Sequence, residues 1–415
     1  MKASLPSLVV PALLLLALAA LLVSERRRLG LLAAYNVRNL RVRWQVTLLA
    51  VFGVALVVAV FVFLGSMANG FALALRATGR ADNAIVVQKG SQSELTSGIP
   101  RDKASLMAVD ARVARGADGQ PLASPEILVV ASFKRLADGA DVNVSVRGVT
   151  ARAFEVRGGL RIVAGRAFQP GLDEIVVGER VRERFGFDVG SRVVIARRAW
   201  TVAGVFASEG SGFESEVWGD ADVMAEPLRR TGGYQALVLR LADPAQLDAL
   251  RETFENDPQL QVQVRREIEY YEAQAGPTAG ALRGLALFVS IVMGVGAVFG
   301  AMNTMYAIVA SRTREIGTLR ALGFSRRLIL SSFVAESVTL ALVGGALGCL
   351  LAVPAGGLST ATGGANFSEL AFAFRVTTRD LAQGMVFAAV MGALGGLLPA
   401  LRAARLPITV ALRES

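Results

Sequence analysis

The sequence predicts an α-helical membrane protein with four core transmembrane helices, an extra N-terminal one, and a large α+β domain inserted between core helices 1 and 2. Of its 415 residues, 53% are hydrophobic and only 19% are charged. The hydrophobic residues cluster in long uncharged runs with Arg-rich flanks, which is typical of helices that cross a bilayer. Residues 67–280 differ, since they carry charges of both signs and short β-rich runs.

Composition also narrows the possible functions. The net charge of +10 could indicate nucleic-acid binding, but the Arg residues flank apolar runs and no aromatic-interleaved basic patch is present. Membrane topology and contact with anionic lipids explain the charge better, so no nucleic-acid partner is expected. The chain has one cysteine, Cys349, and no histidine. We therefore expect no disulfide framework, no cysteine or zinc site and no His-based catalytic triad.

Residues 1–25 are predicted to form the extra transmembrane helix. Residues 3–24 are uncharged, and the basic cluster Arg26–Arg28 follows them, whereas a secretory signal would place its charges first. This order puts the N-terminus outside. Two other interpretations of this segment remain open: a cleaved signal peptide, and an interfacial segment kinked at Pro6 and Pro11. Residues 26–44 then predict a basic amphipathic helix along the cytoplasmic face.

The core helices follow from the uncharged runs. Val46–Ser66 would span ~31 Å as a helix at ~1.5 Å per residue, which matches a bilayer and places core helix 1 at 45–66. The remaining segments are predicted as core helices at 281–311, 328–356 and 381–402, an outer loop at 357–380, and a cytoplasmic tail at 403–415. Each later core helix has a small-xxx-small step that permits close packing within a monomer or across a dimer: Gly296/Gly300, Gly344/Gly348 and Gly392/Gly396.

The domain at 67–280 is predicted to be α+β and large enough to have its own core. Pro244–Glu255 reads as a helix between its last two β-rich runs. The predicted strands are Ala84–Gln88, Ile127–Phe133, Val142–Val149, Glu174–Val177, Val193–Ala196, Thr201–Phe206, Ala236–Leu241 and Leu260–Val264. Ser208–Asp220 contains several glycines together with Phe213 and Trp218, and is predicted to be an exposed loop or one that packs its own aromatics.

The stretch 312–327 predicts a short basic loop on the cytoplasmic side. Ile316, Leu319 and Leu322 recur on one side of a short helix. Gly323 can end that helix, and Ser325 can cap the next one. Phe324 and Ile329 fall at the positions of a hydrophobic staple around this cap.

Two passages resemble a known family. The run R-E-I-G-x-x-R-A-L-G at 314–323, followed by Glu336-Ser337 and glycines 344, 345 and 348, resembles the cytoplasmic loop and third helix of FtsX/MacB-type ABC transporter permeases. Any short cytoplasmic loop tends to be basic, but the ordered spacing favours the family. Residues 174–206 resemble the MacB-like periplasmic core domain. The similarity extends over most of residues 30–415, the run 79–91 resembles DevC-like exporter permeases, and the extra N-terminal helix departs from the family's four.

The resemblance implies a bacterial inner-membrane permease subunit that docks on a separate ABC ATPase and works with a periplasmic membrane-fusion adaptor. It would form a homodimer or pair with a second permease. The docking residues would be Arg312, Arg314, Glu315, Ile316, Gly317, Arg320, Ala321, Leu322 and Gly323. The sequence shows no G-x-x-x-x-G-K-[ST] motif, so ATP and Mg would be bound by the partner, and this chain would be a non-catalytic subunit without a cofactor. A carboxylate that faces lipid costs free energy, so we expect Glu336 to face the helix bundle or the inner headgroups. Phe213 and Trp218 are candidate contacts for adaptor or substrate.

The expected function is to transmit ATPase-driven motion to the periplasmic domain for export or extraction of a lipid, lipoprotein, peptide or small hydrophobic compound. Two alternatives stay open. An FtsX-like regulator would activate a periplasmic cell-wall hydrolase, and a lipoprotein-releasing permease of the LolC type would bind acylated protein at the outer helix ends. A membrane-anchored enzyme is disfavoured because the chain offers no reactive constellation.

Overall fold

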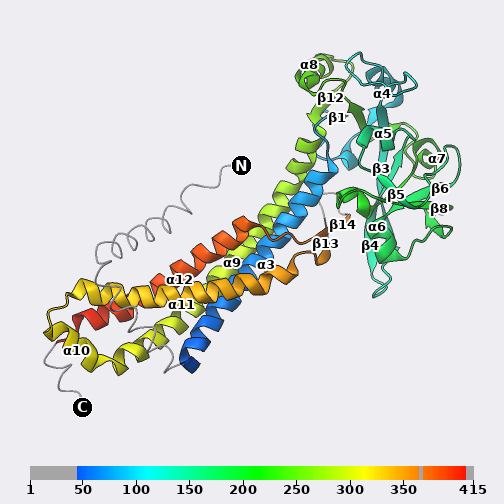
Figure 1. Cartoon of the computed structure of the whole chain (residues 1–415). Coiled ribbons are helices and arrows are strands. Elements are labelled where there is room, and N and C mark those ends of the chain that lie inside the picture. Colours follow the sequence, from blue (N-terminus) through cyan, green and yellow to red (C-terminus); the bar gives the residue numbers. More distant parts are fainter. Residues whose placement is uncertain (1–43, 364–367, 408–415) are drawn as a thin grey trace. The chain divides into compact units, whose positions relative to one another are not determined.

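The structure, a computed structural model, describes residues 44–363 and 368–407 (Figure 1). These residues form two compact units. Unit 1 comprises residues 44–67, 282–357 and 375–407, and unit 2 comprises residues 68–281 and 358–374 apart from the four undescribed positions. The predicted helix at 1–25, the amphipathic segment at 26–44 except Trp44, and the end of the tail lie outside the described residues.

Four helices of the described chain are long and apolar enough to cross a membrane. They are α3 (Trp44–Thr78), α9 (Glu267–Ser311), α11 (Arg326–Ala352) and α12 (Thr378–Arg405), and Figure 1 labels each of them. α3 and α9 are longer than the predicted core helices at 45–66 and 281–311, because both continue into unit 2. The helix α12 begins with a capping box in which the Thr377 hydroxyl and the Asp380 carboxylate satisfy each other's backbone N–H groups.

Glycines bring the helices of unit 1 together. A Cβ on Gly344 would lie 2.6 Å from the Val51 carbonyl oxygen, so α11 touches the α3 backbone there. A Cβ on Gly396 would lie 2.6 Å from the Ser337 Cβ, so α12 approaches α11 just as closely. A Cβ on Gly296 or Gly300 of α9 would meet no atom of the described residues within 4 Å. Two of the three small-residue steps are therefore used within the monomer, and the third has no close contact in the described part of the chain.

Unit 2 is built on a mixed ten-stranded sheet with the order β12-β1-β11-β3-β4-β9-β6-β8-β5, and β7 pairs with β8. The long strand β3 pairs antiparallel with β11 through residues 123–126 and with β4 through residues 127–134, and so joins the two parts of the sheet. The strands are β1 (Asn83–Gln88), β3 (Ala123–Lys134), β4 (Asp141–Val149), β5 (Arg161–Gly165), β6 (Glu174–Gly178), β7 (Arg192–Ile195), β8 (Arg198–Ala207), β9 (Glu216–Asp220), β11 (Ala236–Arg240) and β12 (Val262–Arg266).

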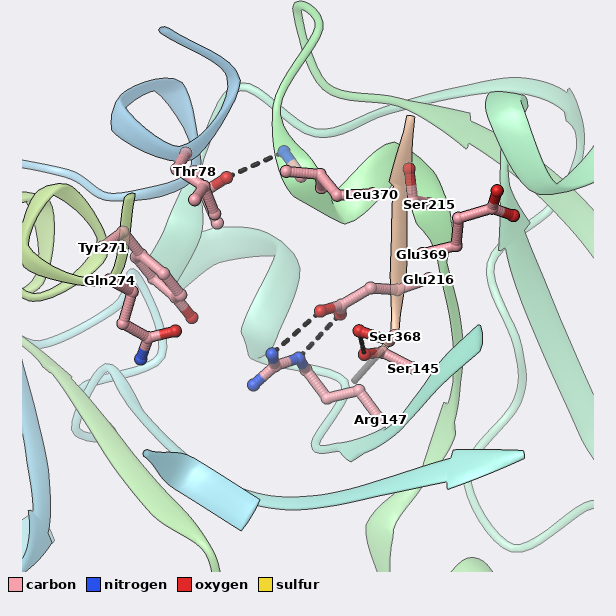
Figure 2. A pocket seen from close by; sticks show the side chains of 12 residues that line it. Thr78, Ser145, Arg147, Ser215, Glu216, Tyr271, Gln274, Ser368, Glu369 and Leu370 are labelled. Carbon is pink, nitrogen blue, oxygen red and sulfur yellow. Dashed lines mark hydrogen bonds and ion pairs between the residues drawn. The ribbon is translucent and has the colours of Figure 1, made fainter. Parts of the chain in front are cut away.

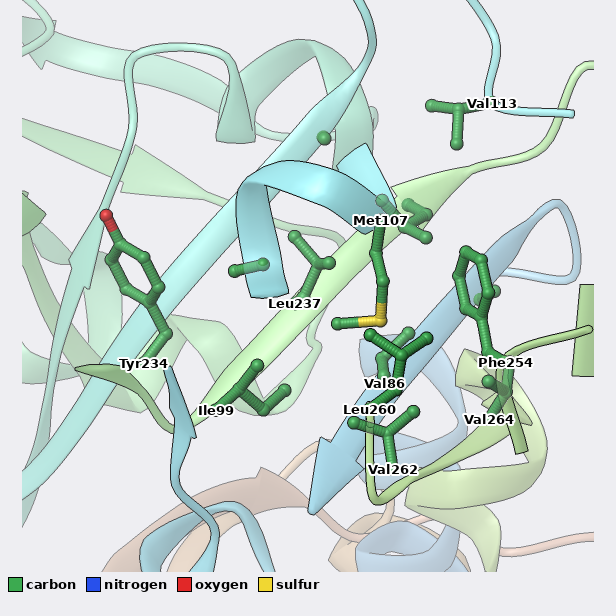
Figure 3. Close-up of a cluster of buried hydrophobic side chains, with 14 of the residues drawn as sticks. Val86, Ile99, Met107, Val113, Tyr234, Leu237, Phe254, Leu260, Val262 and Val264 are labelled. Carbon is green, nitrogen blue, oxygen red and sulfur yellow. The ribbon is translucent and has the colours of Figure 1, made fainter. Parts of the chain in front are cut away.

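Short helices cover the sheet and close three buried apolar clusters. In one cluster, Met107 and Phe254 pack over Leu237 of the central strand β11 (Figure 3). The helices are α4 (Arg101–Ala108), α5 (Ala153–Arg157), α6 (Glu179–Phe185), α7 (Ala221–Ala225) and α8 (Leu247–Asn256), with 3-10 turns η1 (Glu94–Thr96), η2 (Gly212–Ser215) and η3 (Pro244–Gln246); β2 (Ile99–Pro100) pairs with β10 (Gly233–Tyr234). All eight predicted strands of this domain are found, with shifted ends.

The prediction that residues 357–380 form only a loop is wrong, because they include two strands. After the turn η4 (Val353–Ala355), the chain forms an antiparallel hairpin of β13 (Ser359–Gly363) and β14 (Glu369–Ala373), and this hairpin belongs to unit 2. Residues 370–374 form a short apolar run that a strand can bury, and Ala371, Phe372 and Phe374 are buried.

Candidate functional site

The helix α10 (Thr313–Ala321) lies between α9 and α11 and forms the predicted coupling loop. It ends in a Schellman motif, in which the N–H of Gly323 donates to Arg320 O and the N–H of Phe324 donates to Leu319 O. Gly323 adopts φ +91°, which favours glycine. The Ser325 hydroxyl then accepts the N–H of Leu328 and caps α11. The predicted stop and cap are both confirmed.

Arg312 joins α10 to the membrane helix α11. Its Nε donates to Glu315 Oε2 at 3.0 Å and its Nη1 donates to Glu336 Oε2 at 3.3 Å. Its guanidinium carbon also lies 5.2 Å from the Phe333 ring centroid, in a cation–π contact. The side chains of Arg312 and Glu336 are 11% and 3% exposed, so the pair is nearly dry. Glu336 therefore faces the inside of the bundle, one of the two environments expected for it.

The other predicted docking residues separate into two sets. Ile316 and Gly317 are buried, and Ile316 packs in an apolar cluster with Ile329 and Phe333. Arg320 Nη1 donates to the Ala404 carbonyl oxygen of α12 at 3.4 Å. Those residues hold α10 against unit 1. Arg314, Ala321, Leu322 and Gly323 are exposed, and Leu322 is 72% exposed.

The exposed residues of this second set form a surface that is both basic and apolar. Arg314 supplies a cation, and Leu322 supplies an apolar side chain that the described part of unit 1 leaves exposed. Arg326 and Arg327 are also exposed at the start of α11. An apolar anchor with a cationic rim is an arrangement that fits docking on a protein surface with acidic groups. α10 thus presents one exposed face, while its other face packs against α11 and contacts α12.

A second cluster, in unit 2, escaped the sequence interpretation. Arg147 of β4 is hydrogen-bonded to three carboxylates, at 2.5 Å to Glu94, 2.8 Å to Glu126 and 2.8 Å to Glu216. Arg157 of α5 bonds Glu126 at 2.6 Å and Glu267 at 2.5 Å. All six side chains are buried or nearly so. Because Glu267 starts α9, this cluster fastens the first turn of that helix to the sheet.

The buried cluster keeps its charges by mutual pairing. Burial alone would raise the pKa of Glu126, but Arg157 and Arg147 outweigh it and hold that pKa below its ordinary value. Burial would likewise lower the pKa of Arg147, yet Glu216 and Glu94 raise it well above its ordinary value. Single charged residues inside β-rich runs, Glu126 and Arg147, were the only sequence signal for such a cluster. Their partners come from distant segments.

The predicted contact role of Phe213 and Trp218 is wrong for this structure. Trp218 is fully buried and Phe213 is 2% exposed. The segment is not an exposed loop, because it forms η2 and the central strand β9 between β4 and β6. The Trp218 Nε1 donates to Glu216 at 2.7 Å, and the Phe213 ring stacks on the Arg157 guanidinium, 4.3 Å from its carbon. Both aromatic side chains therefore pack against the buried charged cluster of Arg147, Arg157 and their carboxylate partners.

No metal site is evident among the described residues, which bring no three His, Cys, Asp or Glu side chains together in a way that could hold an ion. Two arrangements of charged side chains stand out: α10 is tied to α11 by the Arg312–Glu336 pair, and the buried cluster of unit 2 holds the start of α9.

Comparison with known proteins matches the chain to two family models. One, described as the MacB-like periplasmic core domain, covers residues 47–257, and the other, described as the FtsX-like permease C-terminal region, covers residues 287–408. The macrolide export ATP-binding/permease protein MacB of Burkholderia pseudomallei (strain 1710b) is 29% identical over 300 residues, covering 66% of this chain and 44% of that protein. MacB of Nitrobacter winogradskyi is 31% identical over 354 residues, covering 80% and 52%.

The chain thus spans about half the length of the MacB relatives that it matches. The uncharacterized ABC transporter permease YknZ of Bacillus subtilis (strain 168) is 34% identical over 134 residues, covering 32% of this chain and 30% of that protein. Among solved structures, the periplasmic region of MacB from Actinobacillus actinomycetemcomitans aligns with 48% of this chain and 94% of its own, at 10% identity and a TM-score of 0.37.

Proposed function

Because the chain belongs to the FtsX/MacB-type ABC transporter permeases, we propose that it is the membrane subunit of a complex in which a separate ATPase moves α10. The complex would use this motion to drive unit 2, on the far side of a bacterial inner membrane. ATP and Mg would be bound by the partner, and two copies of this chain would form a homodimer.

One observation carries the proposal. The exposed Arg314 of α10 and Leu322 at its C-cap belong to the same short element whose buried Ile316 and neighbouring Arg312 contact α11. A force applied at the exposed face would therefore reach a membrane helix through a nearly dry ion pair and an apolar contact. Because packed interfaces shift between discrete arrangements, such a contact can transfer motion.

We propose that the motion serves export or extraction of a lipid, lipoprotein, peptide or small hydrophobic compound, with a periplasmic membrane-fusion adaptor. Support comes from relatives named as export permeases for macrolides and for pyoverdine. An FtsX-like regulator that activates a cell-wall hydrolase would use the same α10, so the two functions differ in the extracytoplasmic partner rather than in the coupling site.

Affinity purification of the full chain from mildly solubilised membranes tests the proposal. We expect an ABC ATPase to copurify, and Arg314→Glu or Leu322→Asp to abolish its recovery, while Leu172→Asp on exposed unit 2 surface is the matched control. Recovery of the ATPase with both α10 variants would contradict docking through this helix. An adaptor protein in the purified material supports export, and a cell-wall hydrolase supports the regulator.

A further inference from the structure

The β13–β14 hairpin comes from the segment between α11 and α12, yet it is part of unit 2. The helices α3 and α9 continue into unit 2 directly. The helix α11 is joined to unit 2 through α10 and α9 at its start and through this hairpin at its end, and the hairpin is also what joins α12 to unit 2. Any movement that α10 imposes on α11 must therefore pass through the hairpin, or through other helices, to reach the sheet.

An acidic side chain fixes the hairpin at a basic site. Glu369, the first residue of β14, places Oε2 2.9 Å from Arg184 Nη1 of α6. Its Oε1 lies 3.7 Å from Nη1 of Arg135, which follows β3. The Glu369 side chain is 19% exposed, so water screens these pairs less than fully exposed ones. One carboxylate thus joins the hairpin to two separate elements of the sheet layer.

Neutral contacts complete the docking. The N–H of Ala371 donates to Ser215 Oγ of η2 at 3.0 Å, and Ser368 Oγ lies 2.9 Å from Ser145 Oγ of β4. Phe372 is buried and packs edge-on against Phe71 of α3, with ring centroids 5.5 Å apart. A small cavity of about 50 Å³ remains beside this contact, where Ser368 faces Ser145 and Arg147 faces Glu216 (Figure 2).

We infer that the β13–β14 hairpin is a second connection, which stays docked on unit 2 and transfers movement of α11 and α12 to the sheet. Glu369 is the positioning residue that keeps it docked. This inference rests on the proposed function, since it adds a transmission element to the same ATPase-driven motion. Docking by one ion-pair network and a few neutral contacts makes the connection breakable by one charge reversal.

The test uses the full chain in complex with its copurifying ATPase in lipid nanodiscs. Amide hydrogen exchange of unit 2 peptides is measured with and without ATP plus vanadate. We expect the native complex to show a nucleotide-dependent difference in α6 and β4, and Glu369→Arg to lose it while ATP hydrolysis continues. The double variant Glu369→Arg/Arg184→Glu should regain it, because the charges are exchanged. Glu183→Arg, an exposed neighbour on α6, is the charge-matched control.

A covalent lock separates docking from folding. Ser145→Cys/Ser368→Cys in a Cys349→Ala background, oxidised across the 2.9 Å contact, holds the hairpin in place. We expect the locked chain to keep the nucleotide response, and the lock to restore the response of Glu369→Arg. An unchanged response in Glu369→Arg, or a response abolished by the lock, overturns the inference.

Gly317→Trp in α10, measured in the same assay, distinguishes the two levels of failure. If Gly317→Trp loses the response and Glu369→Arg keeps it, only the hairpin inference fails. If the native complex shows no response to nucleotide, or Gly317→Trp keeps the full response, the proposed function itself fails.

Discussion

The Nη1 atom of Arg312 lies 3.3 Å from Oε2 of Glu336, so the residue just before α10 is paired with a carboxylate one third of the way along α11. Arg312 also pairs with the half-exposed Glu315, whose Oε2 lies 3.0 Å from its Nε. The pair with Glu336 is one of the contacts that hold α10 against α11 and α12, beside the packing of Ile316 and the contact of Arg320 with Ala404.

Removing Arg312 should leave Glu336 as an uncompensated buried charge. We expect Arg312→Leu to lower the free energy of unfolding by ~3–5 kcal/mol, the usual cost of breaking one side of a buried pair. In the double variant Arg312→Leu/Glu336→Leu, most of the lost free energy of unfolding should be recovered. Thermal unfolding in detergent, arranged as a double-mutant cycle, measures the coupling, with the exposed Arg327→Leu as control. Strictly additive effects would show that the two residues do not interact.

Substitutions in α10 should separate ATP hydrolysis from function. Glu315→Arg replaces the carboxylate that lies 3.0 Å from Arg312 Nε with a cation, and Gly317→Trp forces a large ring into a buried position. We expect both variants to insert normally and to bind the ATPase, while transport or signalling falls by at least ~10-fold, a coupling loss of about 1.4 kcal/mol. Membrane fractionation measures insertion, and assays of ATP hydrolysis and of transport measure whether the two activities have separated. The exposed Thr318→Ser is the control, and undiminished transport in either variant would contradict the assignment of α10.

The glycine steps predict opposite responses to the same substitution. Gly344→Ala puts a Cβ 2.6 Å from the Val51 carbonyl oxygen, so α3 and α11 must separate, at a cost of ~1–3 kcal/mol. Gly296→Ala meets nothing within 4 Å and should be neutral or stabilising by up to ~1 kcal/mol through helix propensity. The stability of the Gly344→Ala and Gly296→Ala monomers is compared by their resistance to detergent and by thermal unfolding. Equal destabilisation would mean that Gly296 also has a packed partner.

Acid should loosen unit 2 through Glu126. Its pKa is held below the ordinary value in the folded state, so it stabilises unit 2 above the unfolded pKa of ~4.3. That stabilisation is lost as pH falls from this value through the lower folded pKa. Glu126→Gln should remove this acid dependence and cost ~3–5 kcal/mol at neutral pH, since Arg147 and Arg157 lose a shared partner.

Hydrogen exchange of β3 and β4 peptides as a function of pH measures the effect of Glu126 without assuming a two-state unfolding of the whole chain. The exposed Glu226→Gln is the matched control. If the native chain and Glu126→Gln lose protection over the same pH range, Glu126 does not carry the acid response.

Local patterns were enough to predict the elements. Uncharged runs located α3, α9, α11 and α12, and alternating β-rich runs located most strands of unit 2. The stop at Gly323 and the cap at Ser325 are local too, since a left-handed turn and a side-chain cap depend on the residues themselves. The same logic failed for Ser208–Asp220, because glycines read as loop punctuation also allow close packing of a buried strand, as at Gly219 against Met224.

The sequence by itself determined which described segments form helices long and apolar enough to cross a membrane, where the chain turns after α10, and which family it belongs to, because these depend on residues close together in the chain. Only the tertiary structure decided which groups meet: Arg312 with Glu336, Glu126 with Arg147 and Arg157, and Glu369 with Arg184. Those pairs span 21 to 185 residues along the chain. A charge in an apolar run indicates that some partner exists, but only the packing of distant elements determines which one.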